Sequence, residues 1–187
     1  MVKVLIVYAT DYGNTKKMAE AVAEGANSVN GAQAVLKTAD ETTADDLTGA
    51  DALIFGSPVH MGSMDYRMKT LIDKVCGGLW MKDAITGKVG AVFTTGSGFG
   101  NSGAGAELTQ LAMLNNFAEL GLILVPLPKN TPGYPKAGLQ WGPHGRSADE
   151  NLKPKGLADD QLQAARHHGA NVATVALKLG GPLAFAK

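Results

Sequence analysis

The chain of 187 residues has almost no cysteine and no excess of charge of either sign. Cys76 is the single cysteine, which excludes an intramolecular disulfide and a cysteine-ligated zinc or iron–sulfur centre within one chain. Lysine plus arginine and aspartate plus glutamate both number 17, so the formal net charge is zero. Because electrostatic nucleic-acid binding usually requires a basic excess, we expect no nucleic-acid partner.

Long hydrophobic runs are lacking as well. No apolar stretch reaches the roughly 18 residues that suggest a membrane span, so we expect none. The first residues, MVKVLIVYATDYG, are a short apolar run without the layout of a signal peptide. We therefore expect a cytoplasmic protein.

Glycine, in contrast, is abundant, with 24 residues, almost twice its usual share. There is no Gly-X-Y period, which excludes collagen. Hydrophobic residues at 45% and charged residues at 18% indicate a globular chain. The length fits one domain, which we place at 1–180, followed by a tail at 181–187.

Short apolar runs alternate with helical patterns along the chain. Five runs predict β-strands, at 2–9, 32–38, 50–57, 88–95 and 121–127. Their near-continuous apolar character is typical of parallel strands buried on both faces. Apolar residues at helical spacing follow, with Leu108 and Leu111 among those expected to face inward. The pattern predicts an α/β fold with a doubly wound parallel sheet.

Segment 129–156, after the fifth strand, holds five glycines and four prolines and is predicted to be a long loop. Loops of this length are usually functional or mobile. We expect it to border the mouth of a site or a subunit contact.

Three loops follow strands at the sheet edge where α/β proteins bind ligands. The first, Thr10-Asp11-Tyr12-Gly13-Asn14-Thr15, lies between a strand and a helix. Its hydroxyls and backbone N–H groups can surround a phosphate at a helix start. It lacks the Gly-Lys-Ser/Thr sequence of a P-loop, so triphosphate chemistry is not expected. An ordinary helix start capped by Thr10 or Asn14 is the alternative.

The second and third loops would face the first. The second, from Ser57 to Met64, contains His60, which is either a site residue or an exposed loop histidine. The third holds Gly-x-Gly-x-x-Gly at 98–103, a weak dinucleotide match because it follows the fourth strand and lacks the expected acid. We interpret it as a loop whose backbone approaches a ligand closely, or as a flexible Gly/Ser loop.

Other reactive residues show no catalytic pattern. The four histidines have no metal-ligand spacing, so no metal is expected. Ser57 and Ser97 lack the Gly-x-Ser-x-Gly frame of a hydrolase. Cys76 fits a buried position better than a nucleophilic one, and His167 and His168 fit surface or packing positions better than ligand positions.

Taken together, these motifs resemble the WrbA family of flavodoxin-like NAD(P)H:quinone oxidoreductases. The resemblance is carried by KVLIVYATDYGNTKKMAEAVAEGA, DALIFGSPVHMGSMDYRMKTLIDKVCGGLW, GKVGAVFTTGSG, GLILVPLP and AARHHGANVATVALKL. It implies a five-stranded sheet of order 2-1-3-4-5, bound FMN, NAD(P)H as co-substrate, and a homotetramer that is a dimer of dimers.

The resemblance also implies roles for individual residues. The FMN phosphate would be held by Thr10, Asp11, Tyr12, Gly13, Asn14 and Thr15. The isoalloxazine would be contacted by Pro58, Val59, His60, Met61 and Gly62 on one side and by Thr95, Gly96, Ser97, Gly98, Phe99 and Gly100 on the other. His60 and Tyr12 would be catalytic, and Tyr12 and Trp80 would face the substrate, with Trp80 supplied across a subunit contact. Where the family often has a histidine before the fifth strand this chain has Glu119 or Leu120, so His60 or Glu119 would take that role.

The function expected from these observations is two-electron reduction of quinones by NAD(P)H through bound flavin. One alternative is a flavodoxin that carries single electrons between proteins, although such carriers are usually strongly acidic. The other is a non-catalytic flavodoxin-like module for binding or assembly.

Overall fold

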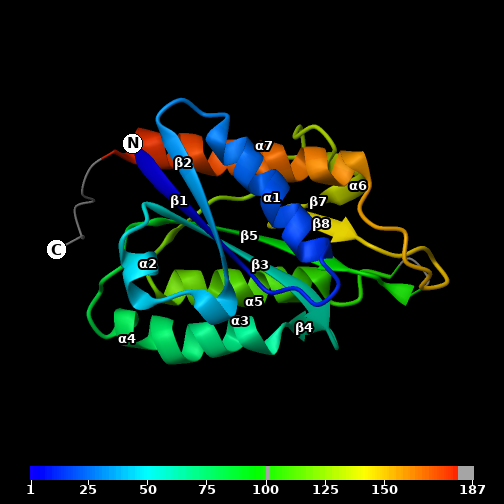
Figure 1. Cartoon of the computed structure of the whole chain (residues 1–187), viewed down its shortest axis with the longest axis horizontal. Coiled ribbons are helices and arrows are strands. Elements are labelled where there is room, and N and C mark those ends of the chain that lie inside the picture. Colours follow the sequence, from blue (N-terminus) through cyan, green and yellow to red (C-terminus); the bar gives the residue numbers. More distant parts are fainter. Residues whose placement is uncertain (100–101, 181–187) are drawn as a thin grey trace.

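The computed structural model describes residues 1–99 and 102–180 and is a mostly parallel sheet with helices on both faces (Figure 1). The sheet order is β2-β1-β3-β5-β8-β7, with β4 paired to β3 and β6 to β5. The strands are β1 (Val2–Tyr8), β2 (Ala32–Thr38), β3 (Ala52–His60), β4 (Ser63–Met64), β5 (Val89–Gly96), β6 (Ile123–Leu124), β7 (Gly138–Leu139) and β8 (Gly142–Arg146). The helices are α1 (Asn14–Asn27), α2 (Ala44–Thr48), α3 (Tyr66–Leu71), α4 (Gly77–Trp80), α5 (Ala106–Glu119), α6 (Tyr134–Ala137) and α7 (Asp159–Leu179).

Two smaller features complete the description. A π-helical segment, Ile72–Cys76, joins α3 to α4, and a short 3-10 turn, Ala39–Glu41, follows β2. Among the described helices, none has the length and hydropathy required to cross a bilayer. The tail predicted at 181–187 lies outside the described residues.

The two faces of β1 are buried by different helix layers. Val4 and Ile6 belong to the cluster formed with α1 and α7, whereas Leu5 and Val7 belong to the cluster formed with α3 and α5. Figure 1 shows these layers above and below the sheet. Burial on both faces explains the near-continuous apolar runs, and the doubly wound sheet of order 2-1-3-4-5 is confirmed.

The fifth predicted strand, 121–127, is much shorter than expected. Only β6, Ile123–Leu124, pairs with β5. Pro126 and Pro128 follow, and because proline cannot donate a ladder hydrogen bond, the chain leaves the sheet there. It returns as β8, which pairs with the last residues of β5. Segment 129–156 therefore contains α6, β7 and β8 and is more than the long loop that was predicted, and β6 and β8 together occupy the fifth strand position.

The buried face of α5 also differs from the prediction. Leu108 and Leu111 do not face inward, since they are 67% and 37% exposed. The helix instead turns Gln110 to the sheet, where its side-chain amide donates to Thr94 Oγ1 at 3.0 Å and to two carbonyl groups of β8. The buried face of α5 therefore combines this polar contact with Met113, Leu114 and Phe117, a mixture that apolar periodicity alone does not reveal.

Candidate functional site

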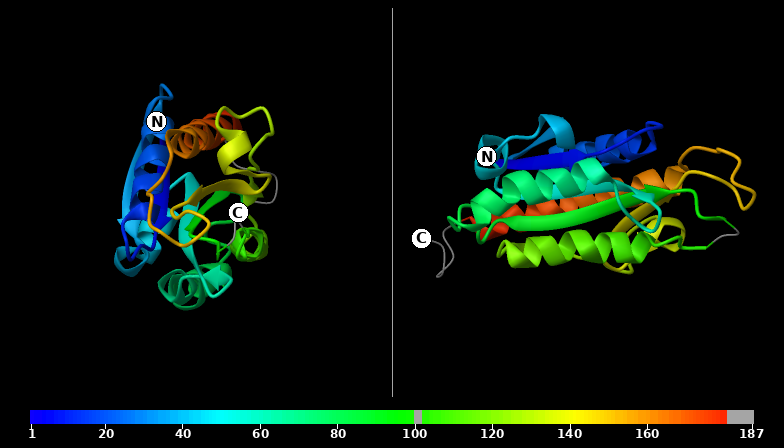
Figure 2. Two further views of the ribbon diagram at one scale, coloured as in Figure 1. Left: turned by 90° about the vertical axis from the view of Figure 1, so that its right-hand side faces the viewer. Right: turned by 90° about the horizontal axis from the view of Figure 1, so that it is seen from below.

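Three loops meet at the carboxyl edge of the sheet, which faces the viewer in the left panel of Figure 2. The first and third lie at the ends of β1 and β5 as predicted, whereas the second, predicted as a loop from Ser57 to Met64, is a hairpin formed by the end of β3 and by β4. A cavity of about 110 Å³ lies between them. It is lined by Thr10, Asp11, Tyr12, Asn14, Thr15, Pro58, Val59, His60, Thr95, Gly96, Ser97 and Ser147. All except Ser147 are residues predicted for the cofactor site.

The loop after β1 leaves the start of α1 without a side-chain cap. Gly13 is the N-cap residue, with a left-handed φ of 80°, and no side chain accepts from the first turn. The hydroxyl of Thr10 accepts instead from Gly13 N–H at 3.0 Å. The alternative of an ordinary cap by Thr10 or Asn14 is therefore wrong. The first N–H groups of a helix have no partner within the helix, so this arrangement leaves donors available to an anion.

A buried hydrogen bond joins the first and third loops. Thr15 Oγ1 and Thr95 Oγ1 lie 2.7 Å apart. Because both hydroxyls are fixed, the start of α1 is held against the end of β5. Tyr12, in the same loop as Thr15, is 90% exposed and its ring stands free at the mouth of the cavity.

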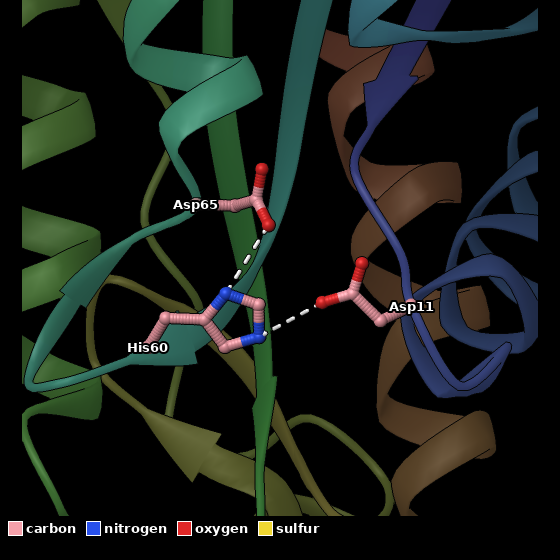
Figure 3. Close-up of side chains that lie close together, drawn as sticks. All are labelled: Asp11, His60 and Asp65. Atoms are coloured by element: carbon pink, nitrogen blue, oxygen red, sulfur yellow. Dashed lines mark ion pairs between the residues drawn. The ribbon is translucent and has the colours of Figure 1, made fainter.

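His60 lies between two carboxylates (Figure 3). Its Nε2 is 3.3 Å from Asp11 Oδ2, and its Nδ1 is 3.2 Å from Asp65 Oδ2. The three residues come from different places: the loop after β1, the end of β3, and the turn before α3. Each ring nitrogen thus faces a carboxylate, one half-exposed and the other buried.

Asp65 and Arg67 form an ion pair next to His60 in this cluster. Arg67 Nε donates to Asp65 Oδ1 and its NH2 group to Asp65 Oδ2, both at 2.8 Å. Burial by itself would raise the pKa of Asp65, but the hydrogen bonds and charge of Arg67 outweigh it and hold that pKa below its usual value. The carboxylate therefore stays ionised although it is fully buried.

The same cluster brings together three groups that can ligate a metal. One ligand atom each of Asp11, His60 and Asp65 lie within 4.8 Å of one another. Arg67 is paired with both carboxylates, and its guanidinium already supplies the positive charge that a cation would bring. The arrangement suits an internal ion-pair network better than a metal site.

The third loop lines a second cavity, of about 220 Å³, beside the first. Val59, Met61, Gly62, Gly96, Ser97, Gly98, Phe99, Gly103, Ala104 and His144 line it. The second and third loops touch, because a Cβ atom on Gly105 would lie 2.6 Å from Gly62 Cα. The backbone carbonyl of Gly98 accepts from Arg146 of β8. Gly100, also predicted for this site, lies outside the described residues.

Strand β8, within segment 129–156, contributes His144 to this edge of the sheet. Its Nδ1 is 3.0 Å from Thr94 Oγ1. Burial, and to a smaller extent the charge of Arg146, lower the pKa of His144 to about 4. The ring is therefore neutral at physiological pH. The sequence pattern does not predict this contact, because it depends on how segment 129–156 folds back onto β5.

Trp80 and Glu119 lie away from this edge. Both line a separate cavity with Cys76 and Asn116. Trp80 ends α4, at the other end of the helical stretch that begins after the His60 loop (Figure 1). Within one chain, the structure does not bring Trp80 or Glu119 to the site formed by the three loops.

Sequence analysis did not identify Asp65, Arg67 or Ser147 as site residues. A signal existed for Asp65, since an aspartate directly before a helical apolar pattern predicts an N-cap. Its carboxylate does accept from Arg67 N–H at 2.9 Å. Nothing in the local pattern distinguishes Arg67 from an exposed helical arginine.

Comparison with known proteins agrees with this fold. The flavodoxin domain family matches residues 5–98. An NAD(P)H dehydrogenase (quinone) of Methanosarcina barkeri is 35% identical, covering 97% of this chain and 100% of the relative. A flavodoxin of Aquifex aeolicus is 46% identical over 64% of each chain. The crystal structure of a WrbA-like flavodoxin from Agrobacterium tumefaciens superposes with a TM-score of 0.72 at 29% identity, covering 95% of this chain and 99% of the other.

Proposed function

This chain belongs to the flavodoxin-like family of the NAD(P)H dehydrogenases (quinone), and from that membership we propose that it is an FMN-dependent NAD(P)H:quinone oxidoreductase. The observation that carries the proposal is the uncapped start of α1 beside the cavity between the three loops. A helix start with free N–H groups, flanked by threonine hydroxyls, suits a phosphate. The second cavity, with its glycine-rich lining, suits the edge of a flat ring system.

In this proposal the first loop, Thr10 to Thr15, holds the phosphate. Residues from Pro58 to Gly62 and from Thr95 to Gly98, together with Phe99, flank the isoalloxazine. Bound FMN supplies the hydride acceptance and two-electron donation that the reaction needs. The protein then contributes binding, orientation and proton supply.

Quinone reduction to hydroquinone consumes one hydride equivalent and one proton. We assign the proton to His60, whose ring lies between Asp11 and Asp65 at the open side of the cavity. Tyr12 is placed to cover a nicotinamide or quinone, since its exposed ring stands beside the same cavity. These roles place a proton donor, His60, and an aromatic ring, Tyr12, at the mouth of the cavity, where the nicotinamide and the quinone must bind in turn.

The test is a steady-state assay of the purified chain with added FMN, both nicotinamides and a panel of quinones. We expect a yellow protein that oxidises NADH or NADPH over many turnovers when a quinone is present. A colourless preparation that takes up no added FMN would contradict the proposal and favour the non-catalytic module.

The similarity to the Aquifex aeolicus flavodoxin makes a protein-to-protein electron carrier the second candidate. Reduced flavin that never turns over with any quinone would favour this carrier. The formal net charge of zero speaks against it, because flavodoxin carriers usually present a strongly acidic surface to their partners.

We also propose a cytoplasmic homotetramer, built as a dimer of dimers. Large apolar side chains are exposed on the layer of α3, α4 and α5, which the right panel of Figure 2 shows from outside; they are Tyr66, Trp80, Met81 and Leu108. A face of this kind favours burial in an assembly, and it would bring Trp80 to the site of a neighbouring subunit. Light scattering coupled to size exclusion tests the assembly, and a monomeric holoprotein would overturn it.

A further inference from the structure

We propose that Arg67 is a charge-compensating and positioning residue that makes the first loop able to bind a phosphate dianion. The inference rests on the proposed function and concerns how this particular chain achieves it. Arg67 would neutralise Asp11 in the phosphate loop and, through Asp65, fix the loop that carries His60.

The need for compensation comes from Asp11 itself. Among the described residues that line the cavity of the three loops, Asp11 is the one carboxylate, and none is lysine or arginine. A carboxylate within a few ångströms of a bound phosphate repels it, and the repulsion is stronger where water is partly excluded. A loop that offers only hydroxyls and N–H groups has no charge of its own to offset this repulsion.

Arg67 supplies that charge from the neighbouring loop. Its NH2 group donates to Asp11 Oδ1 at 2.7 Å and to Asp65 Oδ2 at 2.8 Å. Its NH1 group reaches the backbone carbonyl of Thr10 at 3.4 Å. One guanidinium thus ties the phosphate loop, by both a side chain and the backbone, to the start of α3. An ammonium group, which lacks this planar fork, cannot reproduce the set of contacts.

Asp65 holds the guanidinium of Arg67 in a fixed position. Its carboxylate is fully buried and caps α3, and its own N–H donates to Ser57 Oγ at 2.8 Å. The Arg67 side chain is 18% exposed, so the ion pairs are partly shielded from solvent. Shielded, bidentate pairs hold geometry better than surface pairs do. Because Asp65 also lies against His60 Nδ1, the position of the histidine ring depends on the same pair.

The charges predict what happens when Arg67 is removed. Asp11 and Asp65 then lose the guanidinium that they share and keep the His60 ring, and the bound phosphate meets the charge of Asp11 without Arg67 to offset it. Removing Asp11 together with Arg67 takes away that repulsion. The FMN affinity of the double variant is therefore expected to exceed that of the variant that lacks Arg67 alone.

The experiment measures dissociation constants of FMN and riboflavin by quenching of flavin fluorescence. The proteins are the full wild-type chain, Arg67→Gln, Asp11→Asn and the double variant Asp11→Asn/Arg67→Gln. Riboflavin shares the ring and ribityl chain of FMN but lacks the phosphate, so it is the internal control for a general loss of structure. We expect Arg67→Gln to weaken FMN about tenfold and riboflavin much less, and the double variant to recover most of the FMN affinity.

Hydrogen exchange of the backbone amides of residues 57–65 distinguishes the positioning role of Arg67 from its charge-compensating role. Arg67→Gln is expected to speed exchange in this loop, and the double variant is expected to stay fast, since Asp65 still lacks its partner. Arg67→Lys keeps the charge without the fork, so it should retain FMN affinity better than Arg67→Gln while still exchanging faster than wild type.

Two results would overturn the inference while leaving the proposed function intact. One is a wild-type chain that binds FMN tightly while Arg67→Gln loses FMN and riboflavin to the same degree. The other is a double variant no better than Arg67→Gln. A wild-type chain that binds neither flavin would overturn the proposed function and this inference together.

Discussion

The Oγ1 atoms of Thr15 and Thr95 lie 2.7 Å apart in a buried hydrogen bond between the first turn of α1 and the end of β5. The two residues are 80 positions apart in the chain. The bond therefore joins two of the three loops that form the candidate site. It also gives a direct way to ask how far the stability of the site depends on one polar contact.

Replacing either threonine by valine leaves the other hydroxyl buried without its partner. We expect Thr15→Val and Thr95→Val each to lower the free energy of unfolding by about 1–3 kcal/mol. The double variant should lose clearly less than the sum, because two apolar groups of the same shape leave no orphaned hydroxyl. Urea denaturation measures this, with Thr48→Val, an exposed position, as the control. Strictly additive losses would contradict the coupling.

Gly105 lies where the third loop approaches the second loop closely, at Gly62, and a substitution there tests this contact. It has a φ of +86°, and a Cβ atom there would lie 2.6 Å from Gly62 Cα. Gly105→Ala is expected to cost at least about 1–2 kcal/mol from the left-handed backbone alone and to weaken FMN binding by pushing the second and third loops apart. Gly103→Ala is the matched control, since no atom lies within 4 Å of that position. Equal thermal midpoints for the two variants would contradict the close approach.

Much of the fold can be predicted from local sequence pattern, because a strand that is buried on both faces consists of a nearly continuous run of apolar residues. β1, β2, β3 and β5 are found where such runs occur, and the long helices coincide with apolar periodicity. The fifth strand position was harder to predict, because two separate segments, β6 and β8, fill it. Pro126 interrupts the first, and pairing of the second depends on how a 28-residue segment folds back.

The loops of the candidate site could be predicted from the sequence, but the ion pairs that connect them through Asp65 and Arg67 could not. The first, second and third loops could be predicted because strand ends of a parallel sheet converge. The roles of Asp65 and Arg67 could not, since they depend on a contact from the start of α3 back to Asp11, more than 50 residues earlier in the chain. The exposure of Leu108 and Leu111 shows the same limit, because the buried face of α5 includes a polar residue, Gln110, which apolar periodicity does not indicate.

Cys76 should be chemically inert in the folded protein. Its side chain is 1% exposed, and burial raises the pKa of its thiol to about 11. Since the thiolate is the nucleophile, we expect no measurable iodoacetamide adduct at pH 8 under native conditions and complete modification in urea. Mass spectrometry gives a simple result because the chain has one cysteine. Rapid labelling of the folded chain would contradict the buried position.

His60 can be tested by separating the two halves of the proposed reaction. Reduction of the flavin by NAD(P)H requires no proton from the protein, whereas hydroquinone formation does. We expect His60→Gln to slow the quinone half-reaction by about 10²-fold, a typical contribution of general acid catalysis, with little effect on the nicotinamide half-reaction. Stopped-flow absorbance follows each half separately. His167→Gln, an exposed position on α7, is the control, and equal slowing of both halves would contradict the assignment.

His168 makes the stability of the fold depend on pH. It is completely buried on α7, and burial lowers its pKa to about 4 from an ordinary value of 6.5. The unfolded chain therefore takes up a proton at His168 as pH falls through 6.5, while the folded chain resists protonation until about pH 4. Stability is fully present above pH 6.5 and is lost progressively between these values, by up to about 3 kcal/mol for this one residue. His144, whose pKa is also lowered to about 4, adds a loss in the same window.

His168→Leu is expected to flatten part of this dependence, because the apolar side chain has no proton to gain in the unfolded state. The free energy of unfolding in urea, measured from pH 7.5 to pH 4, should fall less steeply for His168→Leu than for wild type, and the contribution of His144 should remain. His167→Gln, the exposed neighbour, should retain the full wild-type slope. If His168→Leu and His167→Gln changed the slope equally, the buried imidazole would not be the source of the acid sensitivity, and the packing of α7 against the sheet would have to tolerate a charged ring.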